Sequence, residues 1–392
     1  MLLGNNPFPQ DARVRQEAFS LAEAGYHVSV VCPRANGQPR RELVRGVHVY
    51  RYRKSFDAKR PLGYAFEYLE ATVAALVLSI RVAFEEGFDV IHAHNPPDTY
   101  GLVAAVYKLF GRRFVYDHHD LSPEMYEARF PHSPRRSIVN TLIALEKLSH
   151  RLADHVIATN ESYRLIAIER GGVDPGKVSV VRNGPDLERI RPVEGDEALG
   201  AQASTILGYV GVMGYQDGLD HLLRAVHHLV YDLGRTDAFA VLIGKGDAWT
   251  EMKQMATALE IDDYVRFTGH IPDDEMLQLL STADICLVPD PSNAFTDRST
   301  MIKIMEYMAL GKPIVAFDLP EHRVTAQEAA MYARPNDDLE FARTIAALID
   351  DPQRRAKMGE FGRRRAVSEL SWDCSVPHLL AVYAELFADG QT

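Results

Sequence analysis

The stretch DRSTMIKIMEYMALGKPIVAFDLP, residues 297–320, sets out a loop, a helix, a turn, a buried strand and a second loop. Apolar side chains recur at helical spacing over residues 301–308, and Gly311 suits the left-handed residue that ends a helix. Pro313 prevents the helix from restarting, and the apolar run Ile314–Phe317 predicts a buried strand. A helix that leads into a buried strand in this way is typical of a parallel α/β sheet.

The start of this helix is a candidate anion site. Ser299 and Thr300 are expected to cap it, because their side-chain oxygens can accept the free N–H groups of a first turn. Those N–H groups, with Arg298 and Lys303 beside them, could bind a diphosphate. Glu306 lies far enough along the same helix to hold hydroxyls of a ribose joined to that diphosphate. The stretch alone is equally compatible with an ordinary helix–strand crossover whose charges face water.

The composition predicts a globular protein of two domains. The chain has 392 residues, 46% of them hydrophobic and 25% charged, which is more than one ordinary core holds. Its net charge of −11 disfavours nucleic acid as the main partner. The three cysteines lie far apart without metal-ligand spacing, so we expect a reducing cytoplasm and no disulfide framework. We expect a soluble protein, because no signal peptide or bilayer-length apolar stretch is visible.

A run of positive charge stands out between residues 40 and 60. It holds eight Lys and Arg residues against Glu42 and Asp57. Most such runs are solvated faces, but basic residues followed by aromatic ones also suit anionic lipid head groups or a phosphate-bearing substrate. The sequence therefore leaves open a peripheral contact with the inner face of the membrane.

Two successive predicted strands in the first half of the chain end in histidine. The strand at residues 89–94 ends in His94, and the strand at residues 114–117 delivers His118 and His119 to its carboxyl end. Ligands of open parallel sheets bind at that edge. A lone histidine at a strand end is usually structural, whereas two neighbouring strands with this feature favour a functional site.

The alternation of strands and helices runs through both halves and is interrupted once, at the turn-rich sequence RNGPD. We predict two Rossmann-like, doubly wound parallel-sheet domains facing each other across a cleft, residues 1–184 and 185–372. A last amphipathic helix, residues 373–388, follows a break at Trp372 and is expected to pack back on the first domain.

Together these segments resemble the family 4 glycosyltransferases of the GT-B fold, over nearly the whole chain. The likeness is carried by NNPFPQDARVRQEAFSLAEAGYHVSVVCP (5–33), DVIHAHNPPD (89–98), VYDHHDLSPEMY (115–126), VVRNGPD (180–186) and STMIKIMEYMALGKPIVAFDLPE (299–321). The resemblance implies retaining transfer of a sugar from a nucleotide sugar, most often a UDP-sugar, in bacterial polysaccharide or natural-product synthesis. It also implies that residues 1–184 bind the acceptor, a hydroxyl of a glycan, a lipid-linked molecule or a natural product, and that residues 185–372 bind the nucleotide-sugar donor. No Asp-x-Asp motif is present, which agrees with transfer that needs no metal or other cofactor.

The resemblance also implies roles on the donor side. Glu306 matches the glutamate that holds the ribose, whereas Arg298 replaces the first glutamate of the family's Glu-x7-Glu motif. Val212 and Asp217 stand where the family usually has Arg and Lys, so we expect Arg298 and Lys303 to supply positive charge for the diphosphate. The predicted donor-binding set is Gly211, Gly214, Gly244, Lys245, His270, Arg298, Ser299, Thr300, Met301, Lys303 and Glu306.

On the acceptor side, His119 best matches the family's histidine beside the transferred sugar, with His118 as its close competitor. A neutral imidazole can orient a sugar hydroxyl without acting as a base. The resemblance implies front-side attack, in which the leaving diphosphate takes the acceptor proton. The residues expected to border the acceptor are Asn6, Asp11, Arg13, Arg15 and His94.

Two other functions fit the same architecture. One is a nucleotide-sugar enzyme that does not transfer to an acceptor, such as an epimerase or a sugar phosphorylase. The other is a nucleotide-sugar-binding protein that has lost catalysis, which the departures at Val212, Asp217 and Arg298 keep open. A nicotinamide dehydrogenase is disfavoured, because no G-x-G-x-x-G follows any predicted strand.

Overall fold

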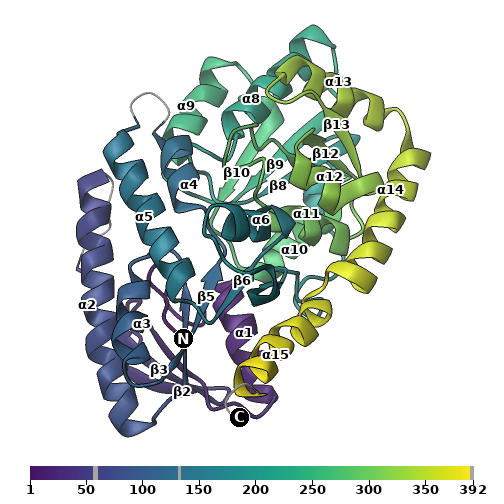
Figure 1. Cartoon of the computed structure of the whole chain (residues 1–392). Helices are drawn as coiled ribbons and strands as arrows, with labels where there is room; N and C mark the ends of the chain where they lie inside the picture. Colours follow the sequence, from purple (N-terminus) through teal and green to yellow (C-terminus); the bar gives the residue numbers. More distant parts are fainter. Residues whose placement is uncertain (56–60, 131–133, 389–392) are drawn as a thin grey trace. The chain divides into compact units, whose positions relative to one another are not determined.

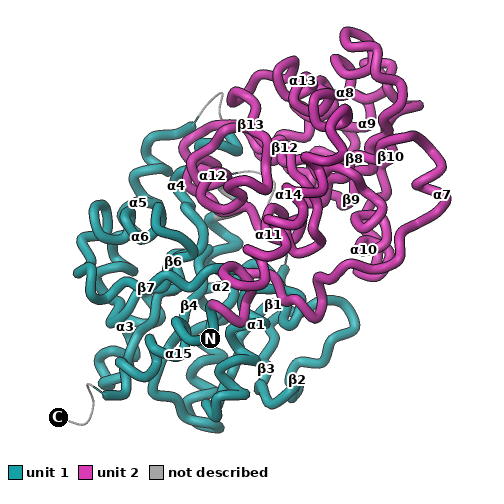
Figure 2. Tube along the Cα trace, turned by 90° about the vertical axis from the view of Figure 1, so that its right-hand side faces the viewer, with its two compact units in different colours: residues 1–183, 375–392 teal, residues 184–374 magenta. Residues whose placement is uncertain are grey.

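A computed structural model describes residues 1–55, 61–130 and 134–388 of the chain (Figure 1). The chain forms two compact units, drawn in teal and magenta in Figure 2. Unit 1 comprises residues 1–183 together with the segment from Ser375 onward, and unit 2 comprises residues 184–374. No helix within the described ranges is long and apolar enough to cross a membrane.

A parallel sheet forms the centre of unit 1. Leu2 bridges β1 and β4 and so connects two groups of strands, in the orders β2-β3-β1 and β4-β5-β6-β7. The strands are β1 (Ser29–Pro33), β2 (Arg41–Val44), β3 (Val47–Tyr52), β4 (Val90–His94), β5 (Arg113–His118), β6 (His155–Ala158) and β7 (Val178–Val180). The helices are α1 (Ala12–Glu23), α2 (Pro61–Glu85), α3 (Tyr100–Lys108), α4 (Ser122–Arg129), α5 (Arg136–Leu152), α6 (Glu161–Glu169) and the 3₁₀ turn η1 (Pro175–Lys177). The predicted strands ending at His94 and His118 are thus confirmed to within a residue.

The basic segment contains an antiparallel hairpin that the sequence analysis missed. β2 pairs with β3 across a turn in which Arg45 and Gly46 both have positive φ. Four of its cations, Arg41, Arg45, Arg51 and Lys54, form ion pairs with glutamates of unit 1. Residues 56–60 lie outside the described part of the chain, and membrane contact through this segment stays a prediction.

Unit 2 is built on one parallel sheet with the strand order β10-β9-β8-β11-β12-β13. The strands are β8 (Thr205–Val210), β9 (Ala238–Ile243), β10 (Val265–Gly269), β11 (Ile285–Val288), β12 (Ile314–Phe317) and β13 (Ala330–Ala333). The helices are α7 (Glu197–Gly200), α8 (Leu219–His227), α9 (Trp249–Ala258), α10 (Asp273–Thr282), α11 (Ile302–Ala309), α12 (Pro320–Ala326), α13 (Asp338–Ile349) and α14 (Pro352–Arg365). Short 3₁₀ or π segments are η2 (His228–Asp232), η3 (Asp262–Tyr264), η4 (Gln327–Ala329) and η5 (Ala366–Leu370). Two apolar clusters cover the two faces of this sheet, which is the doubly wound arrangement.

The quoted stretch folds largely as its residues predict. Gly311 has a φ of 70° after α11, and β12 occupies the predicted strand. The last helix differs from the prediction, because α15 (Trp372–Ala388) begins at the residue expected to break it. Ser371 is extended and separates α15 from η5. In unit 1, Tyr383 of α15 stacks at a tilt on Tyr26.

Candidate active site

Two neighbouring strands of unit 1 bring the histidine-containing loops together. β4 and β5 pair in parallel with His94 opposite Asp117, so their carboxyl ends meet at one edge of the sheet. Asn95 ties the two loops: its Oδ1 accepts from the backbone N–H groups of His119 at 2.8 Å and Asp120 at 3.1 Å. Its Nδ2 donates to the Asp120 carbonyl at 2.7 Å. The sequence prediction missed Asn95, although its place directly after a strand end was a readable signal.

A buried ion pair between Arg13 and Asp117 lies at this edge. Arg13 Nε and Nη2 donate to the two carboxylate oxygens at 2.7 and 2.8 Å, and Nη1 donates to the Val181 carbonyl at 3.1 Å. His94 Nδ1 lies 2.8 Å from the same carboxylate. Burial alone would raise the pKa of Asp117, but Arg13 and hydrogen bonds with His119 and His94 hold it well below its usual range. Arg13 and His94 are both buried and contact Asp117. Contact of these two residues with an acceptor stays a prediction.

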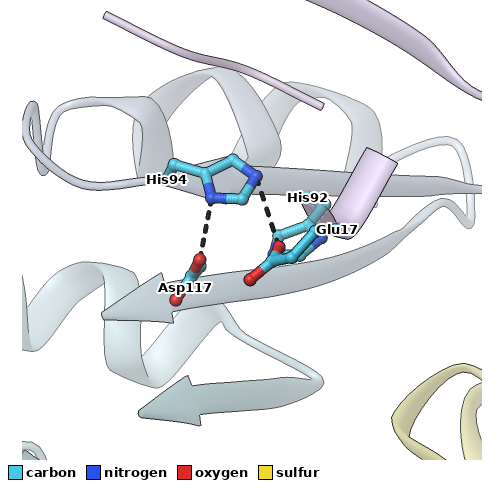
Figure 3. A group of neighbouring side chains, drawn as sticks. All are labelled: Glu17, His92, His94 and Asp117. Atoms are coloured by element: carbon cyan, nitrogen blue, oxygen red, sulfur yellow. Dashed lines mark hydrogen bonds and ion pairs between the residues drawn. The ribbon is translucent and has the colours of Figure 1, made fainter. Parts of the chain in front are cut away.

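Glu17 of α1 completes a buried cluster with His92, His94 and Asp117 (Figure 3). Its carboxylate oxygens lie 3.5 Å from His92 Nε2, 3.8 Å from His94 Nε2 and 3.1 Å from Arg13 Nη2. Carboxylate and imidazole groups could hold a metal ion, but Arg13 already supplies a positive charge here. Burial and the charge of Asp117 raise the pKa of Glu17 well above its usual range. A protonated Glu17 leaves a single negative charge, on Asp117, for Arg13 to balance.

The two candidate catalytic histidines have different surroundings. His119 Nδ1 lies 3.5 Å from Asp117 Oδ2, and 18% of the His119 side chain is exposed. Burial alone would lower the pKa of His119, but the hydrogen bond and charge of Asp117 raise it above its ordinary value. His118 is fully buried, 3.5 Å from Glu146 and packed edge-on against His150. Of the two, only His119 has exposed side-chain surface. Contact of either histidine with a sugar stays a prediction.

His118 belongs to a second buried cluster that is structural. Arg170 Nη2 donates to Glu146 at 2.7 Å and also contacts Glu124. Neither ring nitrogen of His150 has a hydrogen-bond partner among the described residues. Burial lowers the pKa of His150 to about 3. The native state therefore keeps this imidazole neutral.

We expect His150→Phe to reduce the loss of stability in acid. In the wild type the native pKa of about 3 lies below the ordinary value of 6.5, so the unfolded chain binds a proton in that range that the native state does not. The free energy of unfolding then falls by about 1.4 kcal/mol per pH unit below pH 6.5 from this group. Urea unfolding by circular dichroism at about pH 7.5, 5.5 and 4.5 measures the slope. Equal slopes for the wild type and the variant would contradict the prediction.

The remaining residues predicted on the acceptor side shape the first loop of unit 1. Asp11 caps α1 by accepting from the Val14 N–H at 3.0 Å, and Asn6 Nδ2 donates to the other carboxylate oxygen at 3.1 Å. Arg15 Nη1 donates to the Pro9 carbonyl at 3.0 Å. All three predicted residues keep exposed surface, so contact with an acceptor stays a prediction for them.

In unit 2, the loops after β8, β9 and β10 pack against one another at the carboxyl edge of the sheet. The Gly211 N–H donates to the last residue of β9 at 3.1 Å, and the Gly244 N–H donates to the Gly269 carbonyl at 3.0 Å. A Cβ atom at Gly244 would lie 1.9 Å from the Gly211 carbonyl oxygen, so this close approach requires glycine. Gly211 and Gly244 are thus neighbours. Lys245 directly follows Gly244, His270 directly follows Gly269, and both side chains are exposed.

α11 contributes Lys303 and Glu306 to the same unit. Lys303 Nζ donates to both carboxylate oxygens of Asp290 at 3.0 Å, and Asp290 is fully buried after β11. The charge of Lys303 is therefore already paired before any diphosphate is considered. The Glu306 carboxylate makes no hydrogen bond or ion pair within the described residues. Burial raises the pKa of Glu306, although the charge of Arg189 opposes this.

The beginning of α11 differs from the prediction. Ser299 Oγ donates to a carbonyl of the preceding turn at 2.8 Å, and Thr300 Oγ1 donates to the Glu321 carboxylate at 3.2 Å. Each hydroxyl thus donates to a partner outside the helix. The N-cap is Met301, whose side chain makes no capping hydrogen bond, and the helix begins at Ile302. The Ile304 N–H of the first turn donates to the Met301 carbonyl at 3.1 Å. The N–H groups of Ile302 and Lys303 could bind an anion.

The positions that depart from the family pattern have local roles. Asp217 Oδ2 accepts from the Gly214 N–H at 2.8 Å and so closes the loop after β8. Arg298 is exposed, and its Nη1 donates to the Ala294 carbonyl at 2.8 Å. Val212 is exposed as well.

The fold and the two sheet edges place the chain among the GT-B glycosyltransferases. Sucrose-phosphate synthase from Thermosynechococcus elongatus superposes with a TM-score of 0.79, over 97% of this chain and 94% of that one, at 21% identity. Anabaena HepE, solved in complex with UDP and glucose, superposes with a TM-score of 0.72 over 98% of both chains at 17% identity. At these identities the likeness shows the fold.

The chain belongs to glycosyltransferase family 4. Residues 12–189 match the family model described as Glycosyltransferase Family 4, and residues 204–351 match the model described as Glycosyl transferases group 1. The D-inositol 3-phosphate glycosyltransferase of Salinispora tropica is 27% identical over 409 residues, covering 97% of this chain and 81% of the relative. The MMP alpha-(1->4)-mannosyltransferase of Mycolicibacterium hassiacum is 26% identical over 414 residues, covering 97% and 95%. The chain is therefore a glycosyltransferase that uses nucleotide sugars.

Proposed function

We propose that the protein transfers a sugar from a UDP-sugar to an acceptor hydroxyl, with retention of configuration and without a metal ion. The observation that carries the proposal is α11, where the half-buried Glu306 carboxylate makes no hydrogen bond or ion pair within the described residues and the N-cap, Met301, makes no side-chain capping hydrogen bond. Ribose hydroxyls would donate to Glu306, and diphosphate oxygens would accept from the first-turn N–H groups. The bound UDP of HepE supports the choice of nucleotide.

In this proposal unit 2 binds the donor and unit 1 binds the acceptor. The acceptor oxygen attacks the anomeric carbon from the side of the leaving group, while the bond from that carbon to the diphosphate breaks. The diphosphate takes the acceptor proton, and the α11 N–H groups with Lys303 stabilise its charge. His119, held by Asp117 and Asn95, orients a hydroxyl of the sugar. The reaction would serve polysaccharide or natural-product synthesis. The three free cysteines support a reducing, cytoplasmic location.

Calorimetric titration with UDP, GDP and ADP in the presence of EDTA tests the donor site. We expect UDP to bind without a divalent metal and more tightly than the other two nucleotides. Failure of all three to bind would contradict the proposal, and binding that returns only with added Mg²⁺ would contradict its metal-independent part. With a UDP-sugar that turns over, the anomeric configuration of the product, read by NMR coupling constants, tests retention. Rearranged sugar without transfer would instead indicate an epimerase.

We expect loss of the Lys303 ammonium to raise the donor KM by about 10- to 150-fold, because a charged hydrogen bond contributes about 1.5–3 kcal/mol. Lys303→Ala alone would also leave Asp290 buried and unpaired. The test therefore compares Lys303→Ala/Asp290→Asn with Asp290→Asn, so that both backgrounds lack the buried carboxylate charge. An unchanged donor KM between these two variants would contradict the role of Lys303.

A further inference from the structure

We propose that the acceptor carries a hydrocarbon chain, and that an apolar cavity of unit 1 binds it. The proposal rests on the proposed function, because it names the acceptor class of the same enzyme. The cavity has a volume of about 510 Å³, within the range of roughly 300–1,000 Å³ that is typical of small-molecule sites. Four helices form its wall, and Figure 1 shows α2, α3 and α5 side by side. Apolar side chains of the wall include Leu69, Leu102, Met125, Ile138, Leu142 and Leu145.

The cavity shares its wall with the loops of the candidate active site. Pro96, which follows Asn95, and Ser122, which begins α4, both line it. Asn95 ties these two loops together and fixes the backbone at His119. A chain held in the cavity would therefore be anchored beside the sheet edge that carries His119, which is where the acceptor hydroxyl has to lie.

The chemistry of the wall suits hydrocarbon better than sugar. Three threonine hydroxyls of the wall are engaged within it: Thr72 and Thr99 share a hydrogen bond of 2.6 Å, and Thr141 donates to the Ser137 carbonyl at 2.9 Å. Ser122 Oγ, next to the active-site loops, has no hydrogen-bond partner among the described residues. A sugar in this space would lose its hydration without gaining matching hydrogen bonds, at a cost of about 1–3 kcal/mol per group. Burial of a methylene chain has no such cost.

Two features of the rim support a lipid with a phosphate group. Leu69 and Leu102 are 59% and 47% exposed although they line the cavity, so apolar surface is left for a ligand to cover. Between residues 125 and 140 the sequence has three arginines, at 129, 135 and 136, against the single acid Glu127. Arg129 lines the cavity itself. Arg135 and Arg136 come directly before the lining residue Ser137. Guanidinium groups beside an apolar cavity suit a phosphate- or diphosphate-linked lipid.

A series of alkyl phosphates, kept below their micellar concentrations, tests the cavity by calorimetry on the full chain. We expect dodecyl phosphate to bind about 200-fold more tightly than octyl phosphate, because each of the extra buried methylenes contributes about 0.8 kcal/mol and 1.4 kcal/mol is a factor of ten. Equal affinity for the two chain lengths would overturn the proposal. UDP binding, measured in the same preparations, reports the donor site separately, so the two proposals can fail independently.

Paired variants locate the effect. Leu142→Glu places a charge inside the cavity, and we expect the chain-length dependence to fall below about fivefold. Val106→Glu, on the exposed face of α3 outside the cavity, is the control and should keep the full dependence. Ile138→Gln is the second cavity variant, should Leu142→Glu fail to fold. Loss of alkyl binding in the control alone would overturn the proposal. The proposal would also be overturned if the protein bound phosphatidylglycerol vesicles, or dimerised in light scattering, and only Val106→Glu abolished this behaviour. The apolar face that carries Val106 would then bind a bilayer or a second copy.

Discussion

Asp117→Asn is expected to lower the free energy of unfolding by about 3–5 kcal/mol, since it leaves the Arg13 guanidinium buried without a compensating charge. Asparagine has nearly the shape of aspartate but can accept on one side only. Its amide would face either an Arg13 N–H donor or the nitrogen of His94 that now lies 2.8 Å from the carboxylate. The loss therefore comes from charge and hydrogen bonding, not from a cavity.

Urea unfolding measures this change, with the signal chosen for the right unit. Both tryptophans, Trp249 and Trp372, belong to unit 2, so circular dichroism rather than tryptophan fluorescence has to report unit 1. Asp89→Asn is the matched control, because Asp89 pairs with Arg112 at the surface and should change stability by at most about 1 kcal/mol. Equal losses for the buried and the exposed variant would contradict the central role given to Asp117.

The replacement of both partners separates the charge from the packing. Arg13→Met with Asp117→Leu removes the buried pair together, and such replacements are often neutral or stabilising. We expect the double variant to recover most of the stability lost in Asp117→Asn. The raised pKa of Glu17 favours its neutral, protonated form. With a neutral Glu17, the double variant would have no unpaired charge in this cluster.

Sequence patterns were sufficient for the elements of this edge but not for the direction of its side chains. Apolar runs and their histidine ends predicted β4 and β5, because buried parallel strands read as continuous hydrophobic segments. Successive residues of a strand point to opposite sides, so one of His118 and His119 had to face the packed layer. Which one did so depends on Glu146 and Arg170, which come from two later helices. That information is tertiary and is absent from the local pattern.

Two further features escaped the sequence for identifiable reasons. Arg13 and Asp117 are 104 residues apart, and nothing in either local pattern marks them as partners. The β2–β3 hairpin was missed because β2 is an exposed edge strand rich in charge, so its alternation is weak. In unit 2, by contrast, the end of α11 could be predicted from the local sequence. Gly311 follows the apolar run and adopts the left-handed conformation that ends the helix.

UDP is expected to bind about 10- to 150-fold more weakly to Glu306→Ala than to the wild type. The charged hydrogen bonds from ribose hydroxyls to the half-buried Glu306 carboxylate contribute about 1.5–3 kcal/mol, and each 1.4 kcal/mol is a factor of ten. The variant should nevertheless fold, because Glu306 has no hydrogen-bond partner in the described chain to lose. Burial raises its pKa, so above the ordinary pKa of 4.5 its negative charge costs stability in the folded state. Removal of that charge should leave the free energy of unfolding equal or higher.

The ribose contact itself is tested by a cycle of two proteins and two ligands. Wild-type protein should prefer UDP to 2′,3′-dideoxy-UDP by the same 10- to 150-fold, roughly, because the dideoxy ligand lacks both donors to the carboxylate. Glu306→Ala should bind the two ligands almost equally, whereas Glu275→Gln, an exposed acid on α10, should keep the wild-type preference. If Glu306→Ala weakens both ligands to the same extent, the carboxylate acts on the shape of α11 and not on the ribose. The donor would then have to be held by the first-turn N–H groups and Lys303 alone, and inorganic diphosphate would compete with UDP with nearly equal affinity.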